Sequence, residues 1–142
     1  MLRILIIDNN RTFRQSLRYL FRERFPAMEI ETLAGSGDSA DLLSRAVAAD
    51  PDILFADMHC VPGNALDFAR ALRGRLPDRA LVMMCSFDNR EYRRFAYGAG
   101  ADYCLLKDES TFEGIAGLVD YLRLKGAKGL GTGGRRGPGG GK

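Results

Sequence analysis

Short apolar runs alternate with longer amphipathic stretches through most of the chain. Five runs are expected to be strands: Ile4–Ile7, Glu29–Ala34, Ile53–Ala56, Ala80–Ser86 and Tyr103–Leu106. Most of them are continuously apolar and bounded by turn residues, which is typical of strands that are buried on both faces of a parallel sheet. The second and fifth runs have the weakest hydrophobic signal, so composition alone identifies them less clearly.

A helical pattern follows each apolar run. In most of these stretches apolar residues recur on one face, as in helices that cover a core, and the predicted helices span about residues 12–25, 39–49, 64–76, 90–97 and 110–125. Asp38 is expected to cap the second helix. Ser110 and Glu113 have the spacing of a capping box at the start of the fifth helix.

The order of these elements predicts an α/β fold. Strict alternation of strand and helix favours parallel strands joined by right-handed crossovers, and five such units form a doubly wound, three-layer sandwich over residues 1–125. Residues 126–142 differ in character, because nine of these seventeen residues are glycine and the apolar pattern stops. Such a segment buries too little surface to offset its ordering entropy, so we expect a flexible tail.

Composition excludes several classes of protein. With three cysteines and one histidine, a disulfide framework, a cysteine-rich zinc site and a histidine-rich metal site are all disfavoured. No apolar run approaches the roughly 20 residues that a membrane span needs, and the N-terminus lacks the pattern of a signal peptide. A cytoplasmic location is therefore expected.

Charge is distributed unevenly along the chain. The first 120 residues carry 15 basic and 18 acidic residues, a net charge of −3, whereas the rest carry six basic residues and no acid. A basic tail of this kind contacts nucleic acid or an acidic partner in some proteins and is simply solvated in others. Nucleic-acid binding is not expected for the body of the domain.

Chemically active residues lie at the carboxyl ends of four of the five predicted strands. In open parallel sheets, ligands bind beyond the carboxyl ends of the strands, and the residues found there are Asp8, Asn9, Asp57, Cys85, Ser86 and Lys107. A carboxylate can act as a nucleophile and form an acyl phosphate. Mg²⁺ held by carboxylates, together with a lysine, neutralises the charge of a phosphoryl group. The alternative is that Asp57 and Lys107 form only a buried structural ion pair.

Three segments resemble the receiver domains of two-component response regulators: residues 2–8, which end in Asp8, residues 51–57, which end in Asp57, and residues 98–108, which contain Lys107. The resemblance covers about residues 2–124. Lys107-Asp108, where many members have Lys-Pro, is similar to the subfamily that carries a helix-turn-helix output domain. The resemblance implies a flavodoxin-like fold with strand order 2-1-3-4-5.

The same resemblance implies a function for each residue of the pocket. Asp57 would be phosphorylated by a histidine kinase or a phosphotransfer protein, and Lys107 would pair with the phosphoryl group. Mg²⁺ would be held by Asp8, Asn9, Asp57 and the backbone carbonyl of His59. The protein would then be a regulator and not a metabolic enzyme, with at most slow self-dephosphorylation.

The chain departs from the family pattern in the pocket and at the switch. Asn9 stands where the family has a second acid, which predicts weak Mg²⁺ binding because an amide brings no charge. Cys85, or Ser86 if the strand end shifts, takes the place of the switch hydroxyl. Cys104 takes the place of the aromatic switch residue. Tyr103 lies one residue earlier and therefore on the opposite face of the strand. The chain resembles an atypical receiver, and a phosphorylation-independent interaction module is the alternative.

Two further hypotheses concern the thiols and the surface. Thiol sensing by Cys85 and Cys104 would need exposure and a lowered pKa, whereas free cysteine is more often a small buried hydrophobe. The resemblance also implies a homodimer through the face made by the fourth helix, fifth strand and fifth helix. That face would include charged residues of both signs and one aromatic residue, namely Arg90, Arg93, Arg94, Tyr97, Asp102, Asp120 and Arg123. Such residues suit an ordinary solvated surface equally well.

A nucleotide- or flavin-dependent enzyme on the same architecture is disfavoured. No Gly-x-Gly-x-x-Gly or Gly-x-x-x-x-Gly-Lys-Ser/Thr motif follows the first strand, where a phosphate cradle would be expected. Asp8 stands there and repels phosphate unless a cation intervenes.

Overall fold

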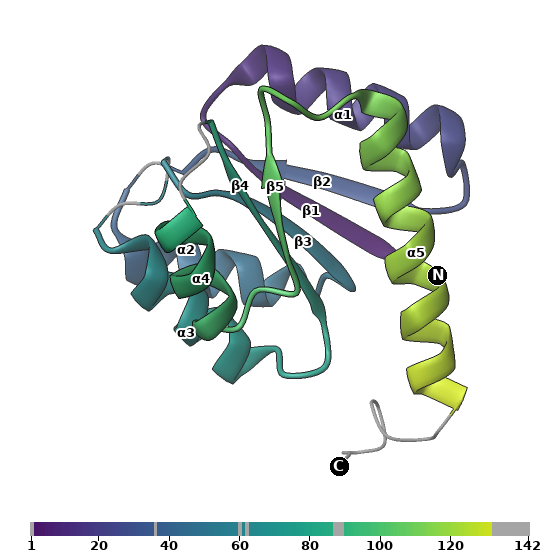
Figure 1. Ribbon diagram of the computed structural model, residues 1–142. Coiled ribbons are helices and arrows are strands. Elements are labelled where there is room, and N and C mark those ends of the chain that lie inside the picture. The colour runs from purple at the N-terminus through teal and green to yellow at the C-terminus, as the bar shows by residue number, and fades with distance from the viewer. Residues whose placement is uncertain (1, 36, 60, 62, 87–89, 132–142) are drawn as a thin grey trace.

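The computed structural model describes residues 2–35, 37–59, 61, 63–86 and 90–131, with backbone alone for residues 126–131. Its five strands are β1 (Arg3–Ile7), β2 (Glu29–Leu33), β3 (Ile53–Asp57), β4 (Ala80–Cys85) and β5 (Tyr103–Leu106). All neighbouring strands pair in parallel, in the order β2-β1-β3-β4-β5 (Figure 1). The predicted sheet and its strand order are confirmed.

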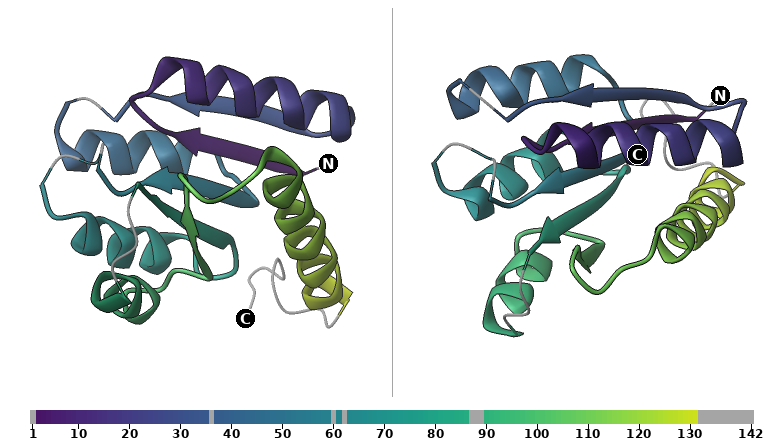
Figure 2. Two further views of the ribbon diagram at one scale, coloured as in Figure 1. Left: turned by 45° about the horizontal axis from the view of Figure 1, so that its top comes forward. Right: turned by 90° about the horizontal axis from the view of Figure 1, so that it is seen from above.

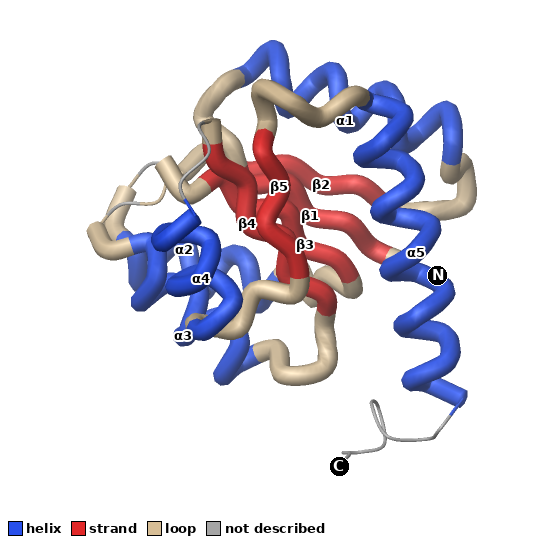
Figure 3. The backbone as a smooth tube through the Cα atoms, viewed as in Figure 1, coloured by secondary structure: helices blue, strands red, loops and turns tan. Residues whose placement is uncertain are grey.

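One helix follows each strand. The helices are α1 (Arg11–Arg24), α2 (Ser39–Ala48), α3 (Ala65–Arg75), α4 (Arg90–Gly98) and α5 (Phe112–Gly131). Buried residues of α1 and α5 join one core cluster, and those of α2, α3 and α4 join the other. Figures 2 and 3 show the sheet between these two helical layers, which confirms the doubly wound, three-layer sandwich.

Burial differs between the central strands and the edge strands of the sheet. β3 is buried at every residue because helices cover both faces of the central strands. β2 is an edge strand, and Glu29 and Glu31 are exposed on it. β5 is the other edge, with four residues and an exposed Tyr103. Edge strands carry polar groups that discourage pairing with other chains, which weakens their hydrophobic signal.

The side chains at the start of α1 and of α2 cap these helices as their types suggest. The Asp38 carboxylate accepts the backbone N–H of Asp41 at 2.6 Å, which confirms the predicted cap of α2. The Asn10 side chain accepts the N–H of Phe13 at 3.0 Å and begins α1 directly after the end of β1. Each contact satisfies one backbone donor that a helix leaves unpaired.

The capping box predicted at Ser110 is wrong. α5 begins at Phe112, and Thr111 Oγ1 accepts the backbone N–H of Gly114 at 3.0 Å. The Ser110 hydroxyl instead donates to the carbonyl of Leu106 at 2.7 Å. Serine and threonine both cap helices well, so adjacent residues of these types leave the starting residue undetermined in the sequence.

α5 continues beyond its expected end near Lys125 as far as Gly131. Once a helix is formed, each further residue adds a backbone hydrogen bond, so glycines lower helix stability without dictating where the helix ends. The predicted flexible tail, residues 126–142, therefore overlaps the end of α5, and its remainder from residue 132 lies outside the described residues.

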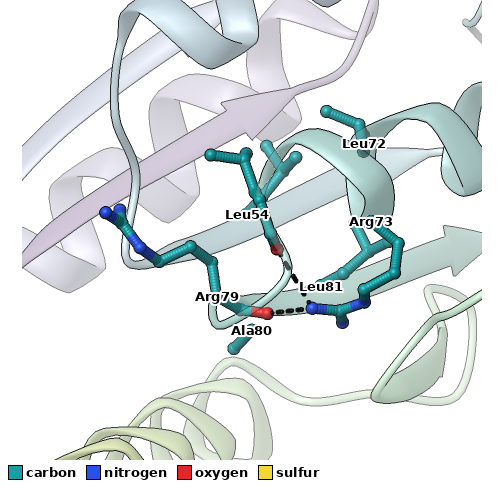
Figure 4. A pocket seen from close by; sticks show the side chains of 7 residues that line it. Leu54, Leu72, Arg73, Arg79, Ala80 and Leu81 are labelled. Atoms are coloured by element: carbon teal, nitrogen blue, oxygen red, sulfur yellow. Dashed lines mark hydrogen bonds between the residues drawn. The ribbon is translucent and has the colours of Figure 1, made fainter. Parts of the chain in front are cut away.

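Arg73 of α3 joins three segments at the end of the sheet opposite the carboxyl ends of the strands. Its guanidinium donates to the carbonyls of Gly100 and Arg79, at 2.7 and 2.6 Å, and pairs with Asp102 at 2.6 Å. Gly100 has φ +116, and an added Cβ would lie 2.9 Å from the Arg73 side chain. Figure 4 shows Arg73 and Arg79 beside a small apolar pocket, with the hydrogen bond from Arg73 to the carbonyl of Arg79 among those drawn. Arg73 thus holds the α4–β5 connection against α3.

We predict that Arg73→Met lowers the free energy of unfolding by about 2–3 kcal/mol, because several backbone carbonyls lose a charged donor. Urea denaturation measures the change. Arg70→Met on the same helix is the control, since among the described residues Arg70 pairs only with Asp67 and both side chains are exposed, at 59% and 72%. Its effect should stay below about 0.5 kcal/mol, and equal losses in the two variants would contradict the structural role of Arg73.

Candidate functional site

Three charged residues meet at the carboxyl ends of the strands. Asp8 follows β1, Asp57 is the last residue of β3, and Lys107 follows β5. Side chains alternate between the two faces of a strand, and each of these residues falls on the face that contributes to the core beneath α1 and α5. Three side chains from distant parts of the sequence therefore lie on the same face of the sheet, at its carboxyl end.

Lys107 lies between the two carboxylates. Its Nζ is 2.8 Å from Asp8 Oδ2 and 3.1 Å from Asp57 Oδ2. The side chains are 12% exposed for Lys107, 1% for Asp8 and 9% for Asp57. Water screens such buried charges poorly, so the ammonium is the main compensation for two neighbouring negative groups. The convergence predicted for these three residues is present.

Backbone groups hold the other carboxylate oxygens. Asp8 Oδ1 accepts the N–H of Asn10 at 2.8 Å, and Asp57 Oδ1 accepts the N–H of His59 at 2.9 Å. Arg14 Nη1 donates to the backbone carbonyl of Asp8 at 2.6 Å. Both carboxylates are therefore oriented before any ligand arrives.

Lys107 is held in its charged form. Burial by itself lowers the pKa of Lys107, but hydrogen bonds to Asp8 and Asp57 and the charges of these carboxylates outweigh burial, and the pKa is raised above 10.5. The folded protein therefore keeps the ammonium protonated at neutral pH. The ion pairs of Lys107 with the two carboxylates contribute to stability. Because the folded-state pKa is raised, this contribution is full below pH 10.5 and is lost only as the pH rises through the folded-state pKa.

Asn9 is not part of this cluster. Its side-chain Oδ1 accepts the backbone N–H of Gly35 at 2.7 Å, so Asn9 ties the end of β1 to the loop after β2. The Asn9 amide oxygen, which is the atom expected to bind a metal, is therefore engaged in a structural contact. His59 contributes its N–H to Asp57, and its carbonyl as a ligand stays a prediction.

The two predicted switch cysteines are buried in the opposite core cluster. Cys104 pairs with Met83 in the β4–β5 register, so Cys85 is its diagonal neighbour. The Cys85 thiol donates to the carbonyl of Leu105 at 3.8 Å. Burial, and then the neighbouring Cys85, raise the pKa of Cys104 to about 11. These features are typical of small buried hydrophobes, while a switch role for Cys85 or Ser86 stays a prediction.

One residue of the site was missed by sequence reasoning. Phe13 falls within the predicted first helix, and its ring lies beside Lys107, with Nζ 4.3 Å from the ring centroid. The ring also lies 6.5 Å, centre to centre, from that of Phe112. Helical periodicity indicates which face is buried but not which distant side chain meets it, so the sequence held no direct signal for this contact.

Residues 4–118 match the sequence pattern of the response regulator receiver domain. The chain belongs to this family. The receiver is similar to a transcriptional regulatory protein of Bacillus subtilis named YxjL, itself uncharacterized, with 28% identity over 123 residues, which are 86% of this chain and 53% of that protein. The chain spans about half the length of the curated relatives it matches.

Solved structures agree on the fold of this receiver. A CheY-like receiver domain protein from Methanospirillum hungatei superposes with a TM-score of 0.77 at 17% identity, covering 90% of this chain and 98% of that one. A response regulator from Burkholderia pseudomallei, solved with a phosphorylated aspartic acid, a calcium ion and citrate, has a TM-score of 0.67 at 22% identity, covering 82% and 65%. In the part of the receiver that the structure describes, no helix is long and apolar enough to cross a membrane.

We predict that Cys104 reacts about 100-fold more slowly with a thiol reagent at pH 8 than an ordinary cysteine, because a pKa near 11 instead of 9.0 lowers the thiolate fraction. Labelling followed by peptide mass mapping, in a Cys60→Ser background, measures the rate. The neutral thiol favours folding, so its contribution to stability is full below pH 9 and is lost as the pH rises through 11. Labelling of Cys104 at pH 8 as fast as in urea-unfolded protein would support thiol sensing instead.

Proposed function

We propose that this receiver is a phosphoacceptor and that Asp57 is the residue that accepts the phosphoryl group. The supporting observation is the contact of a buried Asp57 carboxylate with the Lys107 ammonium, 3.1 Å away, at the edge of the sheet where parallel folds bind ligands. In the reaction, one Asp57 oxygen forms a bond to phosphorus while the bond between phosphorus and the donor breaks. The donor leaves with the electron pair of that bond.

Lys107 has a defined part in this reaction. The ammonium is charged and lies beside the Asp57 carboxylate to which the phosphoryl group would attach, so it is suited to compensate the negative charge on the phosphoryl oxygens. Asp8 holds the ammonium from the other side, at 2.8 Å, and keeps it in the pocket. The phosphorylated aspartic acid in the Burkholderia pseudomallei response regulator is an independent reason to assign this chemistry to the fold.

Mg²⁺ would be held in the pocket by a reduced set of ligands. Asp8 and Asp57 offer two carboxylates that both contact the Lys107 ammonium, and the His59 carbonyl would be the third protein ligand. Among the described residues there is no group of three or more His, Cys, Asp or Glu side chains that could hold a metal ion, and Asn9 is engaged with Gly35. When bound, Mg²⁺ would neutralise charge on the phosphoryl oxygens. We therefore expect weak binding.

The partners follow from this chemistry. The phosphoryl donor would be a histidine kinase or a phosphotransfer protein, in the cytoplasm, and the chain would act as a regulator with no metabolic reaction of its own. A homodimer through α4, β5 and α5 stays a prediction; Phe95, Tyr97 and Tyr103 are exposed there. Asp102 is less available for such a contact, because Arg73 and the N–H of Leu81 engage it.

The test is phosphorylation by acetyl phosphate with Mg²⁺, followed by intact mass. Wild type should gain one phosphoryl group, Asp57→Asn should gain none, and removal of Mg²⁺ with EDTA should slow the reaction strongly. Asp67→Asn is the matched control, because this carboxylate is exposed on α3, and it should react like wild type.

Failure of wild type to gain the group, with both acetyl phosphate and a histidine kinase, would contradict the proposal. The alternative, a receiver that binds a partner without phosphorylation, would then gain support if partner binding is the same in wild type and Asp57→Asn. The alternative is less well supported at present, because a purely structural ion pair does not require both carboxylates to meet one lysine at the ligand-binding edge.

A further inference from the structure

The ammonium of Lys107 is enclosed on two sides by different chemistry. Asp8 and Asp57 contact it through hydrogen bonds of 2.8 and 3.1 Å. The ring of Phe13 lies against it, 4.3 Å from Nζ to the ring centroid. This distance is well within the ~6 Å at which the face of an aromatic ring attracts a cation.

The position of Phe13 is itself fixed by the start of α1. Its backbone N–H donates to the capping side chain of Asn10 at 3.0 Å, and the backbone N–H of Asn10 donates to Asp8 at 2.8 Å. Its ring packs beside that of Phe112 at the start of α5. One short segment thus connects a carboxylate of the pocket, the helix cap and the ring that covers the lysine.

We infer that Phe13 is a positioning residue for Lys107, whose ring holds the ammonium in contact with both carboxylates. The inference rests on the proposed function for the meaning of that position, since Lys107 must remain beside Asp57 to meet a phosphoryl group. An apolar side chain of similar size would fill the space, but it would lack the negative ring face that attracts the cation.

This placement affects binding of a divalent cation. An ammonium that is fixed against Asp8 and Asp57 already neutralises one of their two charges and occupies one oxygen of each. Mg²⁺ needs the same carboxylates, and the two cations repel each other. A ring that keeps Lys107 in place should therefore lower the affinity for Mg²⁺, in addition to the effect of Asn9.

Two measurements test the role of the ring, and neither depends on phosphorylation. The first is the exchange of the Lys107 ammonium protons with solvent, observed as the ¹⁵Nζ signal by NMR and assigned by its loss in Lys107→Met. The second is the Kd for Mg²⁺ alone, from amide chemical shifts near Asp57. Phe13→Leu should speed proton exchange and tighten Mg²⁺ binding, each by roughly two- to fivefold.

Matched variants separate positioning from packing. Phe13→Tyr keeps an aromatic face and should stay within about twofold of wild type in both measurements, and Phe13→Trp, with the strongest ring face, should shift both in the direction opposite to Phe13→Leu. Phe112→Leu removes the ring that neighbours Phe13 and should change neither measurement by more than about twofold, because the ring that lies against the ammonium is still present.

If Phe13→Leu matches wild type in both measurements, or if Phe112→Leu shifts them as much, the inference is overturned. If Phe13→Leu does not fold, the comparison of wild type with Phe13→Trp decides, and no shift there overturns it equally. Either result that overturns the role of Phe13 leaves the acetyl phosphate test of Asp57 unaffected. Conversely, if Asp57 gains no phosphoryl group, the exchange and Mg²⁺ measurements still test the role of Phe13.

Discussion

The contact of one ammonium with two buried carboxylates constrains the whole molecule. Asp8 and Asp57 lie out of water beside each other, and a pair of buried charges of the same sign is costly unless a cation is present. Lys107 supplies that cation from the residue after β5, and β4 lies between β5 and β3. Strands lie about 4.8 Å apart, so a side chain as long as lysine is required to reach over a whole strand. A parallel sheet in the order β2-β1-β3-β4-β5 satisfies these requirements together.

The two ends of the sheet have different tasks. At the carboxyl ends, short loops carry the charged groups, and backbone N–H groups of Asn10 and His59 orient the carboxylates. At the opposite end, Arg73 connects α3 to the α4–β5 loop through backbone carbonyls and Asp102. The ligand-binding end of a sheet requires groups that remain available for chemistry, whereas the opposite end can be closed by contacts that serve stability alone.

Much of this organisation was accessible from the sequence because it depends on regular patterns. Continuous apolar runs are typical of covered central strands. Polar residues placed where such runs end, here Asp8, Asp57 and Lys107, identify the ligand-binding end of the sheet. The strand order came from the resemblance to receiver domains. Three features escaped prediction because each depends on a local choice between similar groups or on tertiary contact: Thr111 caps α5 in place of Ser110, Asn9 binds Gly35, and Phe13 lies against Lys107.

The most direct test of this central contact is a double-mutant cycle between Asp57 and Lys107. The free energy of unfolding would be measured in urea at pH 7 for wild type, Asp57→Asn, Lys107→Met and the double variant. A favourable coupling energy of about 1–3 kcal/mol is predicted, against less than about 0.5 kcal/mol for the exposed Asp67–Arg70 pair. A coupling energy indistinguishable from zero would show that the two groups do not interact and would contradict the account.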